Sequence, residues 1–201
     1  AQLGVKAHKA LIQSTRPGVS EKSLSAVFDF VSSNGGGRGL SYYTIIMSGK
    51  NHKYGHYHQY DRVLEDGDFL ILDAAPDLEE YHVDISTSFP ASGTFSPRQR
   101  ELYEAALAVH DVAIENYRPG VTLKEVGQKM DALIKARGYD RFAEDFRGIV
   151  RVGGYNHSIG MATHDVMGTF AGADEVLKPG FVFACDIQLF RRDEEIGIRI
   201  E

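Results

Sequence analysis

The sequence lacks tryptophan, contains a single cysteine, and has no long apolar run. Cys185 has no second cysteine with which to form an internal disulfide, which suits a reducing compartment. No apolar segment approaches the roughly 18 residues that a membrane-spanning helix needs. Basic residues are in the minority, 22 against 28 acidic ones, so no surplus of positive charge is available for nucleic-acid phosphates. We therefore expect the protein to bind neither nucleic acid nor a membrane. We expect a cytoplasmic location, with a periplasmic or secreted one left open.

The chain is long enough to bury a full core. Its 201 residues are 43% hydrophobic, and a formal net charge of −6 is too small to keep such a chain disordered. The sequence begins with Ala1 and shows no pattern of a signal peptide. We therefore expect a single domain that has been processed, or cut from a longer chain.

The helical part of the sequence occurs twice, at an offset of 102 residues. Residues 16–20 and 118–122 both read Arg-Pro-Gly-Val followed by a hydroxyl residue. In each copy the Pro-Gly pair ends one helix, and Ser20 or Thr122 is placed to cap the next. After Thr122, Glu125 completes the pattern of a capping box.

The strands repeat as well, at an offset of 113 residues. Residues 64–67 and 177–180 each introduce an apolar run that ends in an aspartate. We predict an α/β (α+β) fold of two duplicated halves, about 1–95 and 96–201, which join their strands in one sheet with the helices outside. The alternative to a duplication is that the two segments match by coincidence, because a Pro-Gly pair followed by a capping residue is a common pattern between helices.

Two pairs of acids are spaced for β-hairpins. Asp73 and Asp84 are eleven residues apart, and Asp186 and Glu201 are fifteen apart. A two-residue turn midway between the members of each pair would set them directly opposite one another, on one face of the sheet and with Cβ atoms about 5 Å apart. The turns are expected at Leu78-Glu79 and at Asp193-Glu194.

Four carboxylates in one cleft raise one another's pKa, and cations relieve this crowding. His157 adds an imidazole, and a set of oxygen ligands with one nitrogen and no thiolate suits manganese, cobalt, zinc or iron. Four carboxylates are enough for some of them to bridge two ions, which indicates two metals, about 3.5–4 Å apart, that share a hydroxide. The alternative is that these acids are solvated strand ends.

Five blocks of the chain, kept in order, resemble the pita-bread metallopeptidases, among which aminopeptidase P and prolidase are the most similar members. The blocks are Ser48-Gly49 with His56-Tyr57, Gly67–Asp73, Asp84–Phe89, His157–Gly160 with His164-Asp165-Val166, and Gly197–Glu201. The resemblance covers nearly the whole chain. It implies the pita-bread fold, in which duplicated half-domains surround a curved antiparallel sheet.

The resemblance also implies a site and a reaction. Two divalent metal ions, with manganese expected first and cobalt, zinc or iron as alternatives, are held by Asp73, Asp84, His157, Asp186 and Glu201. His56 and His164 bind substrate and assist catalysis, and Asp186 also acts as the catalytic acid and base. The implied activity is metal-dependent hydrolysis of the N-terminal peptide bond of small peptides, including Xaa-Pro bonds, by a hydroxide activated between the two metals. A homodimer is expected.

The chain departs from the family at three places. Asp186 replaces a glutamate, and Gly153 replaces a histidine of aminopeptidase P, which bears on Xaa-Pro preference. The chain also stops at Glu201, where family members continue, and we expect it to be truncated there and to lack an N-terminal domain. The rival hypotheses are a non-catalytic module that binds peptide or protein on the same fold, favoured by Asp186, and a metal-free hydrolase of creatinase type.

Overall fold

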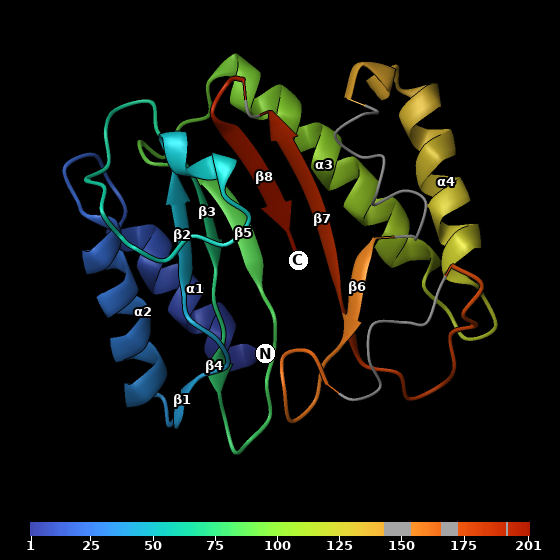
Figure 1. Ribbon diagram of the computed structural model, residues 1–201, viewed down its shortest axis with the longest axis horizontal. Coiled ribbons are helices and arrows are strands. Elements are labelled where there is room, and N and C mark those ends of the chain that lie inside the picture. The colour runs from blue at the N-terminus through green and yellow to red at the C-terminus, as the bar shows by residue number, and fades with distance from the viewer. Residues whose placement is uncertain (143–153, 166–172, 192) are drawn as a thin grey trace.

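The computed structural model describes residues 1–142, 154–165, 173–191 and 193–201, so Gly153 and Val166 lie outside the described residues. Within them each half contains two long helices and three main strands (Figure 1). The first half comprises α1 (Gln2–Ser14), α2 (Glu21–Asn34), β1 (Gly39–Leu40), β2 (Ile45–Ser48), a 3₁₀ segment (Gly49–Lys53), β3 (Phe69–Asp73), β4 (Pro76–Asp77) and β5 (Ser86–Pro90). The second comprises α3 (Pro97–Asn116), α4 (Leu123–Ala136), a 3₁₀ segment (Tyr139–Phe142), β6 (Tyr155–Ser158), β7 (Phe183–Arg191) and β8 (Ile196–Ile200).

The helix starts follow the predicted capping residues. Ser20 Oγ accepts a hydrogen bond from Ser23 N at 3.0 Å at the start of α2. Thr122 and Glu125 form the full capping box at the start of α4, with Glu125 N donating to Thr122 Oγ1 at 3.2 Å. Such a cap satisfies backbone N–H groups that have no partner within the helix.

The two halves share a local arrangement at the turns before these helices. Gly18 N donates to Leu64 O at 2.8 Å, and Gly120 N donates to Leu177 O at the same distance. Both glycines have a left-handed φ, of 88° and 90°, which a residue with a Cβ adopts only at a cost. The Pro-Gly turn is therefore tied in each half to the loop that leads into the central strand.

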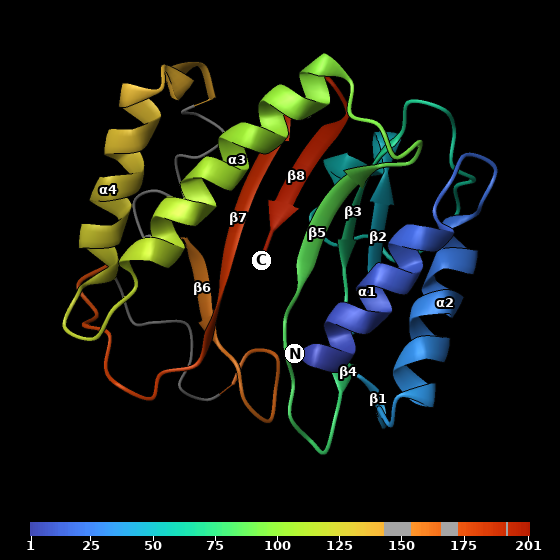
Figure 2. The same cartoon turned by 180° about the vertical axis from the view of Figure 1, so that it is seen from behind.

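The strands form two three-stranded antiparallel sheets, in the orders β2-β3-β5 and β6-β7-β8, and β1 pairs with β4. Strands β5 and β8 lie side by side where the sheets meet (Figures 1 and 2). Arg199 N and O both bond the hydroxyl of Ser88, at 2.8 and 3.0 Å, and Glu201 N donates to Ser86 O at 3.2 Å. The halves thus join edge to edge, as predicted, but a serine side chain takes the place of ladder bonds that would have made one continuous sheet.

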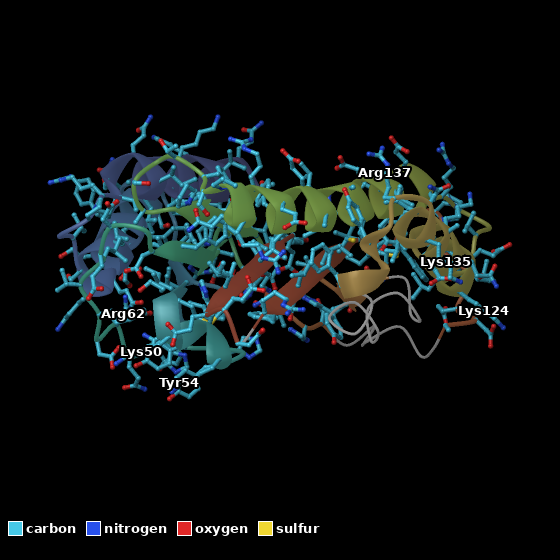
Figure 3. The ribbon with its side chains drawn as sticks, turned by 90° about the horizontal axis from the view of Figure 1, so that it is seen from above. Lys50, Tyr54, Arg62, Lys124, Lys135 and Arg137 are labelled. Atoms are coloured by element: carbon cyan, nitrogen blue, oxygen red, sulfur yellow. The ribbon has the colours of Figure 1, made fainter. Side chains whose placement is uncertain are left out.

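The helices cover one face of the sheets. From behind, α1 and α3 cross the strands while α2 and α4 lie further out (Figure 2), and the view from above shows α1 and α3 on one side of the strands (Figure 3). Leu70 and Leu72 of β3 pack in the cluster with α1 and α2, and Ile187 and Leu189 of β7 pack in the cluster with α3 and α4. Because side chains alternate along a strand, the residues between these point to the other face. Within the described residues no helix is long and apolar enough to cross a membrane.

Candidate metal centre

Strand alternation brings the predicted acids to the face of the sheets that the helices leave open. Asp73 ends β3, Asp186 lies within β7, and Glu201 follows β8. All three side chains are buried, as is that of Asp84 on the loop before β5. The acids are therefore not solvated strand ends, which was the alternative to a metal site.

The register of the first hairpin differs from the prediction by two residues. Asp73 pairs with Ser86 rather than with Asp84, because the turn falls at Glu79 and Glu80, one position later than expected. An even shift keeps the same face of each strand, so Asp84 is the diagonal neighbour of Asp73. The two carboxyl groups still converge on a common partner.

That partner is Tyr42, on the loop between β1 and β2. Its hydroxyl lies 2.5 Å from Asp73 Oδ1 and 2.6 Å from Asp84 Oδ1. Burial, together with the two carboxyl groups, raises the pKa of Tyr42 well above its usual value. The phenol therefore remains protonated and fixes the spacing of the two acids.

The second hairpin has the predicted register. Ile187 pairs with Ile200, and the ladder continues to Arg191 and Ile196, which makes Asp186 and Glu201 the next opposed positions. The side-chain hydroxyl of Ser86, from the other half, donates to Glu201 Oε2 at 3.0 Å. Glu201 is thus held across the junction of the halves.

His157 joins the cluster from β6. Its Nε2 lies 3.3 Å from Asp84 Oδ2 and 3.5 Å from Glu201 Oε1. His164, on the loop after β6, is exposed and stacks on His157 with ring centroids 3.8 Å apart and an interplanar angle of 7°. His56 is exposed on the loop after the first 3₁₀ segment and is close enough to interact electrostatically with Asp84.

In the part of the chain that the structure describes, two groups of side chains have potential ligand atoms within 4.8 Å of one another: Asp73, Asp84 and Glu201, and Asp84, His157 and His164. Asp84 belongs to both groups, and Asp186 belongs to neither. Within the cluster, the buried Asp186 Oδ1 has no hydrogen-bond partner among the described residues, and Glu201 Oε1 has only the 3.5 Å contact with His157 Nε2. Oxygen and imidazole donors with an unpartnered oxygen fit a divalent cation.

The cluster places several ionisable side chains close together in a buried environment, which shifts their pKa values. Burial raises the pKa of Asp73 to about 8 and that of Asp186 to about 7, although the guanidinium of Arg199 acts in the opposite direction. Burial would also raise the pKa of Asp84, but hydrogen bonds from His157 and Tyr42 outweigh it and leave that pKa lowered. Burial opposes the charge on His157, yet hydrogen bonds to Asp84 and Glu201 raise its pKa to about 10.

Arg199 is the main site residue that the sequence reasoning missed. Its guanidinium, only 7% exposed, donates to Asp73 Oδ2, and its Nε and Nη2 lie 3.0 and 2.9 Å from Asp186 Oδ2. The sequence does contain a signal for it. Arg199 lies two residues before Glu201 in an otherwise apolar strand, and because side chains alternate along a strand, Arg199 and Glu201 lie on the same face. Tyr42 was also missed, and its loop carries no such signal.

Comparisons with known proteins agree with this geometry. Residues 1–201 match a family described as Metallopeptidase family M24. The Xaa-Pro aminopeptidase of Escherichia coli is 28% identical over all of this chain and 49% of its own length, and the Xaa-Pro dipeptidase of Rattus norvegicus is 27% identical over 89% of this chain and 39% of its own. The chain thus spans about half the length, or less, of these curated relatives.

Solved structures match at the level of the whole chain. A His-to-Ala variant of Escherichia coli aminopeptidase P superposes with a TM-score of 0.87, at 28% identity, over 99% of this chain and 49% of that one. A structure described as a putative aminopeptidase P from Bacillus anthracis gives a TM-score of 0.84, at 28% identity, over 99% of this chain and 48% of that one. These matches confirm the predicted α/β pita-bread fold and the resemblance to aminopeptidase P and prolidase.

Proposed function

The chain belongs to metallopeptidase family M24, and from this premise we propose that it is a metal-dependent exopeptidase that hydrolyses the N-terminal peptide bond of small peptides. The observation that carries the proposal is the buried cluster of Asp73, Asp84, His157 and Glu201, whose potential ligand atoms converge from both halves. Xaa-Pro peptides are the first substrates to test, because relatives are named Xaa-Pro aminopeptidase and Xaa-Pro dipeptidase.

In this proposal two divalent cations are held by the predicted ligands. Asp73, Asp84 and Glu201 would hold one, and Asp84, His157, Asp186 and Glu201 the other. When bound, the cations would supply Lewis acidity and an activated water at neutral pH. Manganese is proposed first, with cobalt, zinc or iron as alternatives, because the donors are carboxylate oxygens and one imidazole nitrogen.

The remaining residues orient these groups and contact the substrate. Tyr42 binds Oδ1 of Asp73 and Arg199 binds Oδ2, which restricts the orientation of the carboxylate. Partial burial, followed by the charge of His157, lowers the pKa of His164, so its imidazole is neutral at pH 7. A neutral, exposed imidazole beside the cluster would donate a hydrogen bond to a substrate carbonyl oxygen as negative charge develops there. We propose the same class of role for His56, whose pKa burial also lowers.

The test measures metal content and turnover on the same purified chain. Mn²⁺-loaded protein is incubated with Xaa-Pro and Xaa-Ala peptides, with and without a chelator, and the released N-terminal residue is quantified. Hydrolysis that the chelator abolishes is the expected result. Asp84→Asn should remove it, while Asp66→Asn, which changes an exposed aspartate on the same half, should not.

One observation favours a second function, a non-catalytic peptide-binding module on the same fold. Asp186 lies outside both ligand groups, although the family resemblance gives its position the acid–base role. Metal binding and peptide binding without any turnover would favour this module. Hydrolysis without bound metal, unaffected by the chelator, would instead favour the creatinase type. The homodimer and the cytoplasmic location stay predictions.

A further inference from the structure

The carboxylate of Asp186 is held from one side only. Its Oδ2 accepts hydrogen bonds from Gln188 Nε2 and from Arg199, whose Nε and Nη2 lie 3.0 and 2.9 Å away. Its Oδ1 is buried and has no hydrogen-bond partner among the described residues. One oxygen is thus saturated by donors, and the other is the only one that can face a further ligand.

Gln188 reaches Asp186 because of its position on the strand. Residues 186 and 188 of β7 point to the same face, since side chains alternate. In the ladder Gln188 pairs with Arg199 of β8, so the two donors lie directly opposite one another and both extend back to the same oxygen. Arg199 binds Asp73 as well as Asp186, whereas Gln188 donates its hydrogen bond within the cluster to Asp186.

The direction of this carboxylate matters because the side chain is short. An aspartate reaches one methylene less far than a glutamate, and Asp186 belongs to neither group of converging ligand atoms. Its contribution to a metal therefore depends on where Oδ1 points. Fixing Oδ2 with donors from two neighbouring strand positions fixes the side-chain torsions, and with them the direction of Oδ1.

We propose that Gln188 is a positioning residue that binds Oδ2 of Asp186 and thereby directs Oδ1 toward the second metal. This inference rests on the proposed dinuclear function. It makes the metal position that includes Asp186 dependent on Gln188, and this position is expected to fill at the second binding step. The position formed by Asp73, Asp84 and Glu201, whose ligand atoms already lie within 4.8 Å of one another, is independent of Gln188 and is expected to fill first.

The experiment titrates the metal-free chain with Mn²⁺ alone and measures the affinity of each binding step by calorimetry. Gln188→Leu keeps the size and strand preference of the side chain but removes the donor. We expect it to weaken the second step by about 10-fold to 100-fold, the usual cost of losing a group that orients a metal ligand, and to change the first by less than about 2-fold. Gln188→Asn, which keeps the amide but falls a methylene short, should behave similarly.

A matched control separates this effect from a general one. Gln128→Leu replaces an exposed glutamine on α4, the helix whose Lys124 and Lys135 lie at the far end of the molecule in Figure 3. It should leave both binding steps unchanged. Thermal unfolding in the presence of a chelator checks that each variant is folded.

A double-mutant cycle tests whether Gln188 acts through Asp186. In an Asp186→Ala background, Gln188→Leu should have no further effect on the second step. Wild-type affinities in Gln188→Leu, or an effect of Gln188→Leu that persists without Asp186, would overturn this inference and leave the hydrolytic proposal standing. A wild-type chain that binds a single Mn²⁺ would overturn this inference together with the dinuclear arrangement, and leave metal-dependent hydrolysis standing. A wild-type chain that binds no metal would overturn both.

Discussion

Replacing Arg199 by leucine should destabilise the metal-free chain strongly. The guanidinium is buried and hydrogen-bonds two buried carboxyl groups, those of Asp73 and Asp186, with Glu201 Oε2 3.7 Å from its Nη2. Removing one partner of a buried ion pair costs about 3–5 kcal/mol of unfolding free energy. We expect a cost at the lower end of this range. Burial already raises the pKa of Asp73 to about 8 and that of Asp186 to about 7, so a proton can compensate for part of the positive charge that the guanidinium supplied. For a chain of this length, about 3 kcal/mol corresponds to a fall in Tm of about 6–12 °C.

The assay is thermal unfolding followed by circular dichroism at pH 7 with a chelator, so that no cation compensates for the lost guanidinium. Arg38→Leu is the control, since Arg38 forms an ion pair with Glu80 in which both side chains are about 60% exposed. Such a surface pair contributes at most about 1 kcal/mol. Arg199→Lys should be intermediate, because one ammonium group cannot bond both carboxyl groups as the guanidinium does. Equal Tm values for the Arg199→Leu and Arg38→Leu variants would refute the assignment of Arg199 as the bridge between the acids.

Three further predictions concern the ligands, the caps and a buried histidine. Asp84→Asn should reduce the Mn²⁺ stoichiometry more than Asp73→Asn, since Asp84 belongs to both ligand groups; equal losses, measured by metal analysis after desalting, would contradict a shared ligand. Thr122→Ala and Ser20→Ala should each cost about 1 kcal/mol, a fall in Tm of about 2–4 °C, and an unchanged Tm would show that the cap is not needed. Burial lowers the pKa of His52, so the unfolded chain binds a proton more readily than the folded chain, and stability is lost as the pH falls below about 6.5. The Tm of His52→Gln should therefore fall less between pH 7 and pH 5 than the Tm of the wild type. Parallel plots of Tm against pH for the two proteins would count against this prediction.

Local patterns in the sequence predicted much of the fold. The helix starts at Ser20 and Thr122 follow from capping chemistry that acts within four residues. The second hairpin has its predicted register because the charged residues 191–195 mark its tip clearly. Where the chemistry is local, a sequence contains enough information to place an element.

The first hairpin shows why the other register was wrong. Its turn residues, Glu79 and Glu80, both have positive φ, of 55° and 67°, a conformation that asparagine and glycine adopt far more readily. Two glutamates give no signal for such a turn, so the spacing of Asp73 and Asp84 was the only guide. The site tolerated the error because a shift of two residues preserves the face of the strand.

The junction between the halves explains what no local pattern predicted. Ser86 and Ser88 of β5 bond to Glu201 and Arg199 at the other edge, and the same arginine binds Asp73. These contacts join residues more than 100 positions apart, and they depend on how two sheets meet rather than on any spacing within one. The residues that join the halves are thus also the residues that arrange the acids. The geometry of the cluster is therefore a property of the junction, and a cation held by acids from both halves would tie the two sheets together at the place where their backbones make few bonds.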